Sequence, residues 1–582
     1  MSLFSELKRR RVFATAVIYV PAAWLAAEII LVIAQYFSAS EWLGRVVIVL
    51  FLLGFPVALL LSWLFDITKD GVKRASPGTP LGIVTLLASG LFLSAGAYIT
   101  YRIITENPLI SVVILPLEMI TSDPTAESYG FGIAESLRSS LRQTSAFSVP
   151  GRVSSAAVVK AGLDIPGIAK KLDVQYIVEG TLKIVAQKLD VSISLINNGG
   201  NVQWSQGFEG AIEDIFDLHN DIVIAVALQL DLDETDPQLQ RIIGKPAPTH
   251  DVEAYRLYLQ GRRGGEGAAE ALKAANERDP GFADVYAALA LEYATKCWAL
   301  DDRTSSLCDL GVNYADQGLK LDPELGEAMA ALAMIYAVRY QYSEAQAAIK
   351  QLRALPDWLA HSSSLPYAYI NLGRLEEAWN TSVELYKNDR VNPITVSNLA
   401  LFEWMLRDND ALANDYEKML IEMGGQSFLG MFPESRVHRV GLAEALEDAK
   451  NLMPLFDFPS DLADIIVRPA YDVSYRKVAL ENLRALYERG DIRFASYWEN
   501  LISLRQTDEA VDMAFEQFDQ DVLNPVMFWL RDHGRQEFQS HPRFIELVEY
   551  VGLAEYWDQE GWPIFCEPRG GSHICGVDYE VP

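Results

Sequence analysis

Three long apolar stretches near the start of the chain constrain its fold more than any other feature. They cover residues 12–37, 42–65 and 81–104, and each reaches the roughly 20 residues that a helix needs to cross a bilayer core. A cleaved signal peptide has a shorter apolar stretch than the first of them. Residues 1–107 are therefore predicted to form a transmembrane anchor of three helices, with a re-entrant pair in place of the first two spans as the alternative.

Basic residues set the expected orientation of these spans. The basic residues 8–11 precede the first span, and Lys69, Lys73 and Arg74 lie between the second and the third. The positive-inside rule then places the N-terminus and the 66–80 loop in the cytoplasm. After three crossings the rest of the chain lies outside, so we expect a bacterial inner-membrane protein whose soluble domains are periplasmic.

Glu28 lies well inside the first predicted span. A carboxylate at that depth is costly unless it is protonated, paired or turned toward the interior of the bundle. One interpretation is an intramembrane functional residue that senses a proton or a partner. The other is an interhelical hydrogen bond beside Ala23, Ala26 and Ala27, whose small side chains allow helices to approach closely.

The charge of the chain is strongly uneven. Residues 1–108 contain nine Lys/Arg and six Asp/Glu, which leaves 40 basic and 72 acidic residues in 109–582. A region that acidic repels phosphate backbones, so nucleic-acid binding is disfavoured. The acidity otherwise favours solubility and identifies no partner.

Residues 108–235 have the pattern of a mixed α/β domain. A continuous apolar run at 111–117 predicts a buried strand, and Asn197-Asn-Gly-Gly200 predicts a hairpin turn because Asn and Gly tolerate positive φ angles. The expected elements are strands at 111–117, 147–149, 175–185, 189–196 and 202–208, and helices at 127–143, 165–172 and 212–230.

Several runs of this region resemble the TolB amino-terminal-like domain. The resemblance covers nearly all of residues 110–230 and implies a binding module of the bacterial envelope, with no catalytic residues to carry over. The runs that carry it are Val112-Val-Ile-Leu-Pro116, Tyr129-Gly-Phe-Gly-Ile-Ala-Glu-Ser-Leu137, Val174-Gln-Tyr-Ile-Val-Glu-Gly-Thr181 and Gln203-Trp-Ser-Gln-Gly-Phe208.

The residues themselves point away from catalysis. The α/β region contains no phosphate-binding loop and no nucleophile elbow. Its one histidine, His219, falls on the closing helix, where a capped or surface role is expected. The seven histidines of the chain show no metal-ligand spacing. We therefore predict no catalytic, cofactor-binding or metal-binding residue, no cofactor and no enzyme activity.

Helix-turn-helix patterns replace strand signals in residues 251–520. Pro280, Pro323, Pro356 and Pro393 recur at intervals of 43, 33 and 37 residues, close to the 34-residue period of tetratricopeptide repeats, which this region resembles. The prediction is an α-solenoid whose groove binds an extended peptide or a helix; the alternative is a generic helical array. Aligned on the prolines, the first-helix packing residues are Tyr286, Leu289, Ala290 and Tyr293, then Met329, Leu332, Ala333 and Tyr336.

Four cysteines occur as two local pairs, Cys297 with Cys308 and Cys566 with Cys575. In an oxidising compartment an even number of locally spaced cysteines indicates disulfides. The competing interpretation of the second pair is a metal site that includes His573. A structural zinc site needs four ligands, and only three are offered locally, so disulfides are predicted for both pairs.

The whole chain resembles bacterial membrane-anchored tetratricopeptide-repeat proteins that carry a TolB amino-terminal-like domain. A linker is expected at residues 236–250 and a C-terminal cap on the last repeat at 521–582. The leading function is an inner-membrane scaffold or adaptor that binds protein or peptide partners of the cell envelope through the α/β domain and the repeat groove. The alternative is a regulatory or sensor subunit that relays periplasmic binding through its transmembrane helices to a partner.

Overall fold

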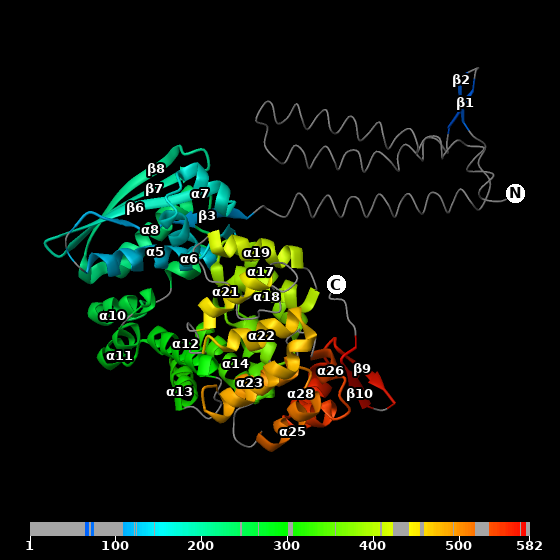
Figure 1. Cartoon of the computed structure of the whole chain (residues 1–582). Coiled ribbons are helices and arrows are strands. Elements are labelled where there is room, and N and C mark those ends of the chain that lie inside the picture. The colour runs from blue at the N-terminus through cyan, green and yellow to red at the C-terminus, as the bar shows by residue number, and fades with distance from the viewer. Residues whose placement is uncertain are drawn as a thin grey trace. The chain divides into compact units, whose positions relative to one another are not determined.

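The computed structural model describes residues 65–68, 71–74 and 109–577, with gaps at 122, 124, 145, 245–246, 266, 301–305, 356, 408–409, 423–440, 454–458, 493, 518–534 and 571. The chain divides into two compact units, residues 1–108 and 109–582. In the first unit, β1 (Phe65–Thr68) and β2 (Gly71–Arg74) pair antiparallel (Figure 1).

The described helices correct the predicted fold class. None of them is both long enough and apolar enough to cross a membrane. The strongly apolar helix α14 (Gly326–Val338), for example, has 13 residues, which is shorter than a bilayer requires. The transmembrane anchor and the inner-membrane localisation derived from it are therefore not supported.

The prediction of an anchor rested on apolar length and on the distribution of basic residues, both read from residues 1–107. The predicted spans at 12–37, 42–65 and 81–104, and Glu28 within the first, lie outside the described residues, apart from Phe65 at the start of β1. What the structure describes instead is a small mixed sheet followed by many helices.

Residues 110–229 form the mixed α/β part of the second unit (Figure 1). Its long strand β7 alternates apolar and polar residues, as expected where one face of a sheet is buried. The elements are β3 (Ile110–Ile114), β4 (Glu118–Met119), α5 (Ala126–Arg142), β5 (Phe147–Ser148), α6 (Arg152–Lys160), α7 (Ile165–Leu172), β6 (Tyr176–Val185), β7 (Lys188–Asn197), β8 (Val202–Ala211), η1 (Ile212–Asp214) and α8 (Ile215–Gln229).

The strands lie in the order β5-β3-β6-β7-β8, with β4 also beside β6. Strand β3 runs parallel to β5 and β6, because helices connect these strands, whereas β6, β7 and β8 form an antiparallel meander. The side chain of Asn197 accepts hydrogen bonds from the N–H groups of Gly199 and Asn201. The structure thus forms the hairpin that the sequence predicts at this turn.

Two cores lie on opposite faces of the sheet. Leu189, Val191, Ile193 and Leu195 of β7 belong to the core on the face that α5 and α8 cover. Helices α6 and α7 cover the other face over β3 and β6. The first core does not stop at the α/β part, because it continues into the first helices of the helical part through residues such as Tyr255.

The helical part follows from residue 237 onward (Figure 1). Its elements are α9 (Pro237–Ile243), α10 (Val252–Arg263), α11 (Ala268–Arg278), α12 (Ala283–Leu300), α13 (Ser306–Leu321), α14 (Gly326–Val338), α15 (Tyr342–Arg353), η2 (Trp358–His361), α16 (Leu365–Asn371), α17 (Leu375–Asn388), α18 (Pro393–Arg407), α19 (Asp410–Glu422), α21 (Leu442–Leu452), α22 (Leu462–Tyr471), η5 (Val473–Tyr475), α23 (Arg476–Glu488), α24 (Phe494–Ser503) and α25 (Thr507–Gln517).

Consecutive helices pack as pairs, with α10 on α11, α12 on α13, α14 on α15, α16 on α17 and α18 on α19. The first helices of neighbouring pairs also contact each other, as α12 does α14 and α14 does α16. Of the residues that the repeat alignment places at first-helix packing positions, Leu289 and Ala290 are fully buried and Met329 is 5% exposed. The close contacts depend on small residues, since Ala290 and Ala333 leave room for the neighbouring helix.

The segment expected to be a linker, residues 236–250, contains helix α9. Asp236 caps it by accepting a hydrogen bond from the Gln238 N–H, and α9 packs on α8. Leu239 and Ile242 are buried in the same core as the sheet. This part of the chain therefore connects the α/β part to the helices as packed structure.

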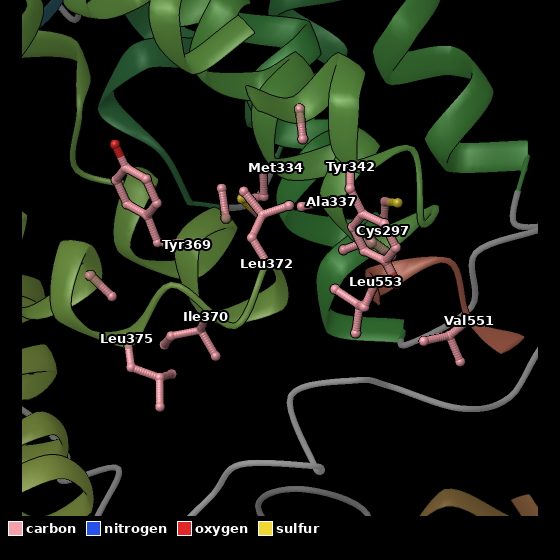
Figure 2. Packing of buried hydrophobic residues seen from close by; sticks show 14 of the residues in the cluster. Cys297, Met334, Ala337, Tyr342, Tyr369, Ile370, Leu372, Leu375, Val551 and Leu553 are labelled. Atoms are coloured by element: carbon pink, nitrogen blue, oxygen red, sulfur yellow. The ribbon is translucent and has the colours of Figure 1, made fainter. Parts of the chain in front are cut away.

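The C-terminal segment contains α26 (Arg535–Gln539), α27 (Phe544–Tyr550), α28 (Leu553–Glu560), β9 (Cys566–Arg569) and β10 (Ser572–Cys575). Helix α27 contacts α25, the last helix of the array that the structure describes before this segment. Helix α28 instead packs on α15. Figure 2 shows Val551 and Leu553 in the same buried cluster as Tyr342 and Leu372. The segment thus returns to the middle of the array as well as contacting its last helices.

Candidate protein-binding surfaces

The four cysteines form two disulfides in the structure. Cys297 of α12 is bonded to Cys308 of α13, so the bond joins the two helices of one pair. Cys566 and Cys575 are bonded across the β9–β10 hairpin. Disulfides persist in oxidising environments. In the described residues no group of His, Cys, Asp and Glu side chains could hold a metal ion.

The Cys297–Cys308 bond should contribute measurably to stability. The two cysteines are 11 residues apart in the sequence. Closing a loop of that length lowers the entropy of the unfolded chain, which stabilises the folded chain by about 2–3 kcal/mol. We expect the Cys297→Ser/Cys308→Ser variant to unfold at lower urea concentration, with a loss of that size. Adding a reductant should lower the midpoint of the unvaried chain more than that of the variant, which keeps only the Cys566–Cys575 bond. Equal midpoints for the two oxidised chains would contradict the prediction.

His219 lies in the interior of the molecule. The sequence favours a capped or surface position, but the side chain is 4% exposed on α8, with its ring beside Phe216 and Tyr255. Burial lowers the pKa of His219 to about 3, because the charged imidazolium is poorly solvated there. Helix α8 is apolar around most of its circumference. The spacing of its apolar residues therefore does not show which side of the helix faces the core.

This buried histidine predicts sensitivity to acid. The folded-state pKa lies below the ordinary 6.5, so protonation favours the unfolded chain and stability falls as the pH drops below about 6.5. Between pH 7 and pH 5 the loss is about 2 kcal/mol. We expect His219→Leu to remove that part of the pH dependence in urea unfolding at the two pH values. A variant with the full dependence would show that another group is responsible.

Asp389, after α17, joins the α/β part to the helical array. Its carboxylate accepts hydrogen bonds from the Gly151 N–H at 2.5 Å and from the Ser154 hydroxyl at 2.6 Å. These donors lie at the start of α6, where a negative charge is favourable. Burial raises the pKa of Asp389, and the two hydrogen bonds and Arg142 oppose that rise. The carboxylate is 6% exposed and acts as the cap of a helix on another part of the chain.

A second contact joins the same two parts at α5 and α10. A Cβ atom on Gly132 of α5 would lie 2.6 Å from Leu259 Cδ1, so the two helices approach closely only because this residue is glycine. At the exposed margin of the contact between α5 and α10, Arg263 forms an ion pair of 2.5 Å with Glu127. The α/β part is therefore fixed to the helical array at two places far apart in sequence.

A half-buried group of charged residues lies between the first three helix pairs. Arg262 of α10 donates two hydrogen bonds to Glu327 of α14, at 2.9 and 2.7 Å. Burial and then the charge of Glu327 raise the pKa of Asp284 on α12 to about 6. Burial opposes the charged form of His361, but Asp357 and Glu327 outweigh it and raise the pKa of this histidine. The Arg262–Glu327 ion pair joins α10 to α14, and Asp284 of α12 and His361 of η2 lie close enough for its charges to shift their pKa values.

Helix α14 is covered by neighbouring parts of the chain on almost all of its surface. The buried residues of α14 include every position except Glu327 and Tyr336. Trp298 of α12 reaches Tyr367 of α16, with ring centroids 4.9 Å apart, although α13, α14 and α15 lie between these two helices in sequence. The chain's own residues therefore leave little of α14 exposed, and the groove that the sequence predicts along the array stays a prediction.

A hollow of about 330 Å³ lies between β8 and α8. Trp204 and Phe208, which point to the same side of β8, form its wall on the strand, with ring centroids 6.4 Å apart. Ile224 and Leu228 of α8 are half-buried at its opposite wall. The full lining is Trp204, Gln206, Phe208, Asp221, Ile224, Ala225, Leu228 and Gln229.

No family model matches the chain. The chain is similar to a protein named putative adenylate cyclase 3 from Rhizobium meliloti (strain 1021), with 27% identity over 193 residues. The match covers 31% of this chain and 32% of that protein, so the chain spans about a third of the length of this relative. Because the relative carries the name of an enzyme, the prediction that this chain has no enzyme activity is not confirmed. The resemblances to TolB-like domains and tetratricopeptide repeats stay predictions.

Proposed function

We propose that this chain is a protein-binding adaptor, which takes protein or peptide partners on its α/β part and on its helical array. The observation that carries the proposal is the joint between these parts. Asp389 caps α6 from the end of α17, and Gly132 allows α5 to pack against α10. An adaptor needs such a joint, because partners on two surfaces keep a defined distance only if the surfaces are fixed to each other.

The arrangement of the array supports binding on its outer surface. Helix α14 is covered almost entirely by the chain itself. On α13, Leu310 and Leu321 are 38% and 48% exposed, and their spacing of three helical turns places them on one side of the helix. Asp316 and Lys320 are also exposed on α13, on a different side.

Site-specific photocrosslinking in intact cells tests the adaptor. A photoreactive amino acid is placed in the full chain at Leu310 or Leu321, with Asp316 and Lys320 as control positions on the same helix. We expect one discrete crosslinked protein from the two leucine positions and much less of it from the controls. Equal crosslinking at all four positions, or none above background, would overturn the proposal for the array.

A second candidate function is conversion of ATP to cyclic AMP, which the name of the relative alone favours. The purified full chain is incubated with ATP and a divalent cation, and cyclic AMP is measured. Production at a rate proportional to protein concentration would establish that activity. A rate equal to that of buffer would leave the adaptor as the function that the geometry supports.

A further inference from the structure

Strand β8 lies at an edge of the sheet and lacks most of the features that usually protect an edge strand. It has ten residues and pairs with β7 on one side, and no described strand pairs with its other side. Proteins usually protect such edges with proline, lysine, a bulge or a very short strand. Residues 202–211 contain no proline and no lysine, and the register shift lies at the hairpin end, between Leu195 and Ile196 of β7.

The register shows which backbone groups of β8 point outward. The Ile212 N–H donates to the Gln187 carbonyl, and this pair continues the β7–β8 register. Hydrogen-bonded and non-hydrogen-bonded pairs alternate along antiparallel strands. The N–H and C=O groups of residues 204, 206, 208 and 210 therefore face β7, and those of Ser205, Gly207 and Glu209 face outward.

The contact between Ser194 and Ser205 agrees with this assignment. Their hydroxyl oxygens are 2.9 Å apart, and directly opposite side chains come closest in non-hydrogen-bonded pairs. Gly207 lies between the two other outward residues, and a Cβ atom there would meet nothing within 4 Å. A glycine in a strand interior often marks a place where another backbone approaches closely.

The hollow lies beside this open edge. Trp204 and Phe208 form its strand wall, and Ile224 and Leu228 of α8 its helix wall. A strand added to β8 would direct every second side chain to the face that carries α8. The hollow is large enough to take a leucine or phenylalanine side chain from such a strand. Backbone hydrogen bonds with pockets for alternate side chains are the features of peptide recognition by strand addition.

The charge around the edge identifies the kind of partner. Residues 189–240 contain ten Asp/Glu and no Lys or Arg. Glu209 lies on the edge itself and Asp221 on the wall of the hollow. A basic segment would be attracted to this surface. A second copy of β8 would bring the same acidic residues together, which disfavours pairing between copies.

We propose that the outer edge of β8 binds an extended, basic segment of another protein as an added strand, with an apolar side chain of that segment in the hollow between β8 and α8. The inference gives a partner chemistry to the α/β surface of the adaptor and rests on that proposed function. It uses the three outward residues Ser205, Gly207 and Glu209 for backbone hydrogen bonds.

Fluorescence anisotropy with the full chain tests the proposal. The probe is a short synthetic peptide that alternates lysine with valine and phenylalanine. We expect saturable binding that weakens as salt is added. Ser205→Pro removes one outward N–H and leaves the bonds to β7, so it should weaken binding at least tenfold, whereas the matched control Ser205→Ala should bind within about twofold of the unvaried chain. Ala225→Trp, which fills the hollow, should also weaken binding at least tenfold.

Several results would overturn the proposal. One is no binding of the basic peptide. Another is equal binding of a version that is N-methylated at alternate residues and so cannot pair as a strand. A third is a dimer in light scattering that Ser205→Pro abolishes, which would assign the edge to a second copy. If the unvaried chain does not bind the peptide but still gives the α13 crosslinks, this site is removed and the adaptor proposal stands, so the two failures are distinguishable.

Discussion

Replacing Trp557 with alanine is expected to destabilise the chain by about 3–5 kcal/mol, the usual cost of removing a large buried aromatic side chain. Trp557 of α28 is fully buried. Its indole N–H donates to the Leu372 carbonyl at 2.9 Å, and its ring lies against Gly373, where a Cβ atom would be 2.8 Å from it. Gly373 has φ +70° in the turn between α16 and α17, so this position is closed to side chains by both conformation and contact.

The matched control is Trp562→Ala in the same segment. Trp562 is half-buried, and its ring stacks on His573 at the β9–β10 hairpin. We expect less than half the loss of stability that Trp557→Ala gives. Hydrogen exchange identifies where the loss occurs: exchange in α15, α16 and α17 should become faster in Trp557→Ala. Unchanged exchange in these helices would show that the C-terminal segment does not stabilise them.

Asp389→Ala is expected to lower the free energy of unfolding by about 3–4 kcal/mol and to weaken the joint between the α/β part and the helical array. Breaking a buried charged contact has this cost because it leaves the partners unpaired. The Gly151 N–H and the Ser154 hydroxyl lose their acceptor. Arg142 loses a nearby negative charge that favours its own charged form. Hydrogen exchange at the start of α6 should rise, and proteases should cleave the chain between the two parts more readily.

Arg390→Ala provides the control for this joint. Arg390 forms an ion pair of 3.1 Å with Asp173, and the two side chains are 52% and 70% exposed. An exposed pair contributes little, so we expect a change of less than about 1 kcal/mol. Asp389→Asn keeps one acceptor oxygen and should fall between the two. If Arg390→Ala and Asp389→Ala had the same effect, the buried cap would not be the source of the stability.

The local parts of this fold could be predicted from the sequence. The Asn197–Gly200 turn follows from residues that accept positive φ, and the strands on either side follow from their alternation of apolar and polar residues. The helix pairs between 280 and 390 follow from the repeated spacing of proline, aromatic and small residues. In each case the signal lies in the same turn, strand or helix pair that it predicts.

The joint could not be predicted because its partners are distant. Asp389 and Gly151 are 238 residues apart, and each looks like an ordinary residue at the end of a helix. Arg262 and Glu327, on different helices, likewise look like surface charges. The almost complete burial of α14 could not be predicted either, because a repeat pattern fixes how neighbouring pairs pack and leaves open what else covers them.

Some features of the open β8 edge can be recognised in the sequence, and others only in the structure. Its glycine and its lack of lysine and proline are visible in residues 202–211. Only the strand order shows that this segment lies at the edge, and only the register shows which of its amides face outward. In the sequence the acidic stretch from 189 to 240 is part of a general acidity of the chain, whereas the structure places Glu209 on the edge strand and Asp221 beside the hollow.

The return of α28 to the middle of the array has a consequence for synthesis on the ribosome. Leu372 and Trp557 are 185 residues apart, and at 5–20 residues per second the second of them emerges roughly 10–40 s after the first. During that time the apolar surfaces that α28 covers on α15 and α16 face solvent. A nascent chain in this state is a substrate for chaperones, and a chain that stops before residue 557 should aggregate although most of its helices are already present.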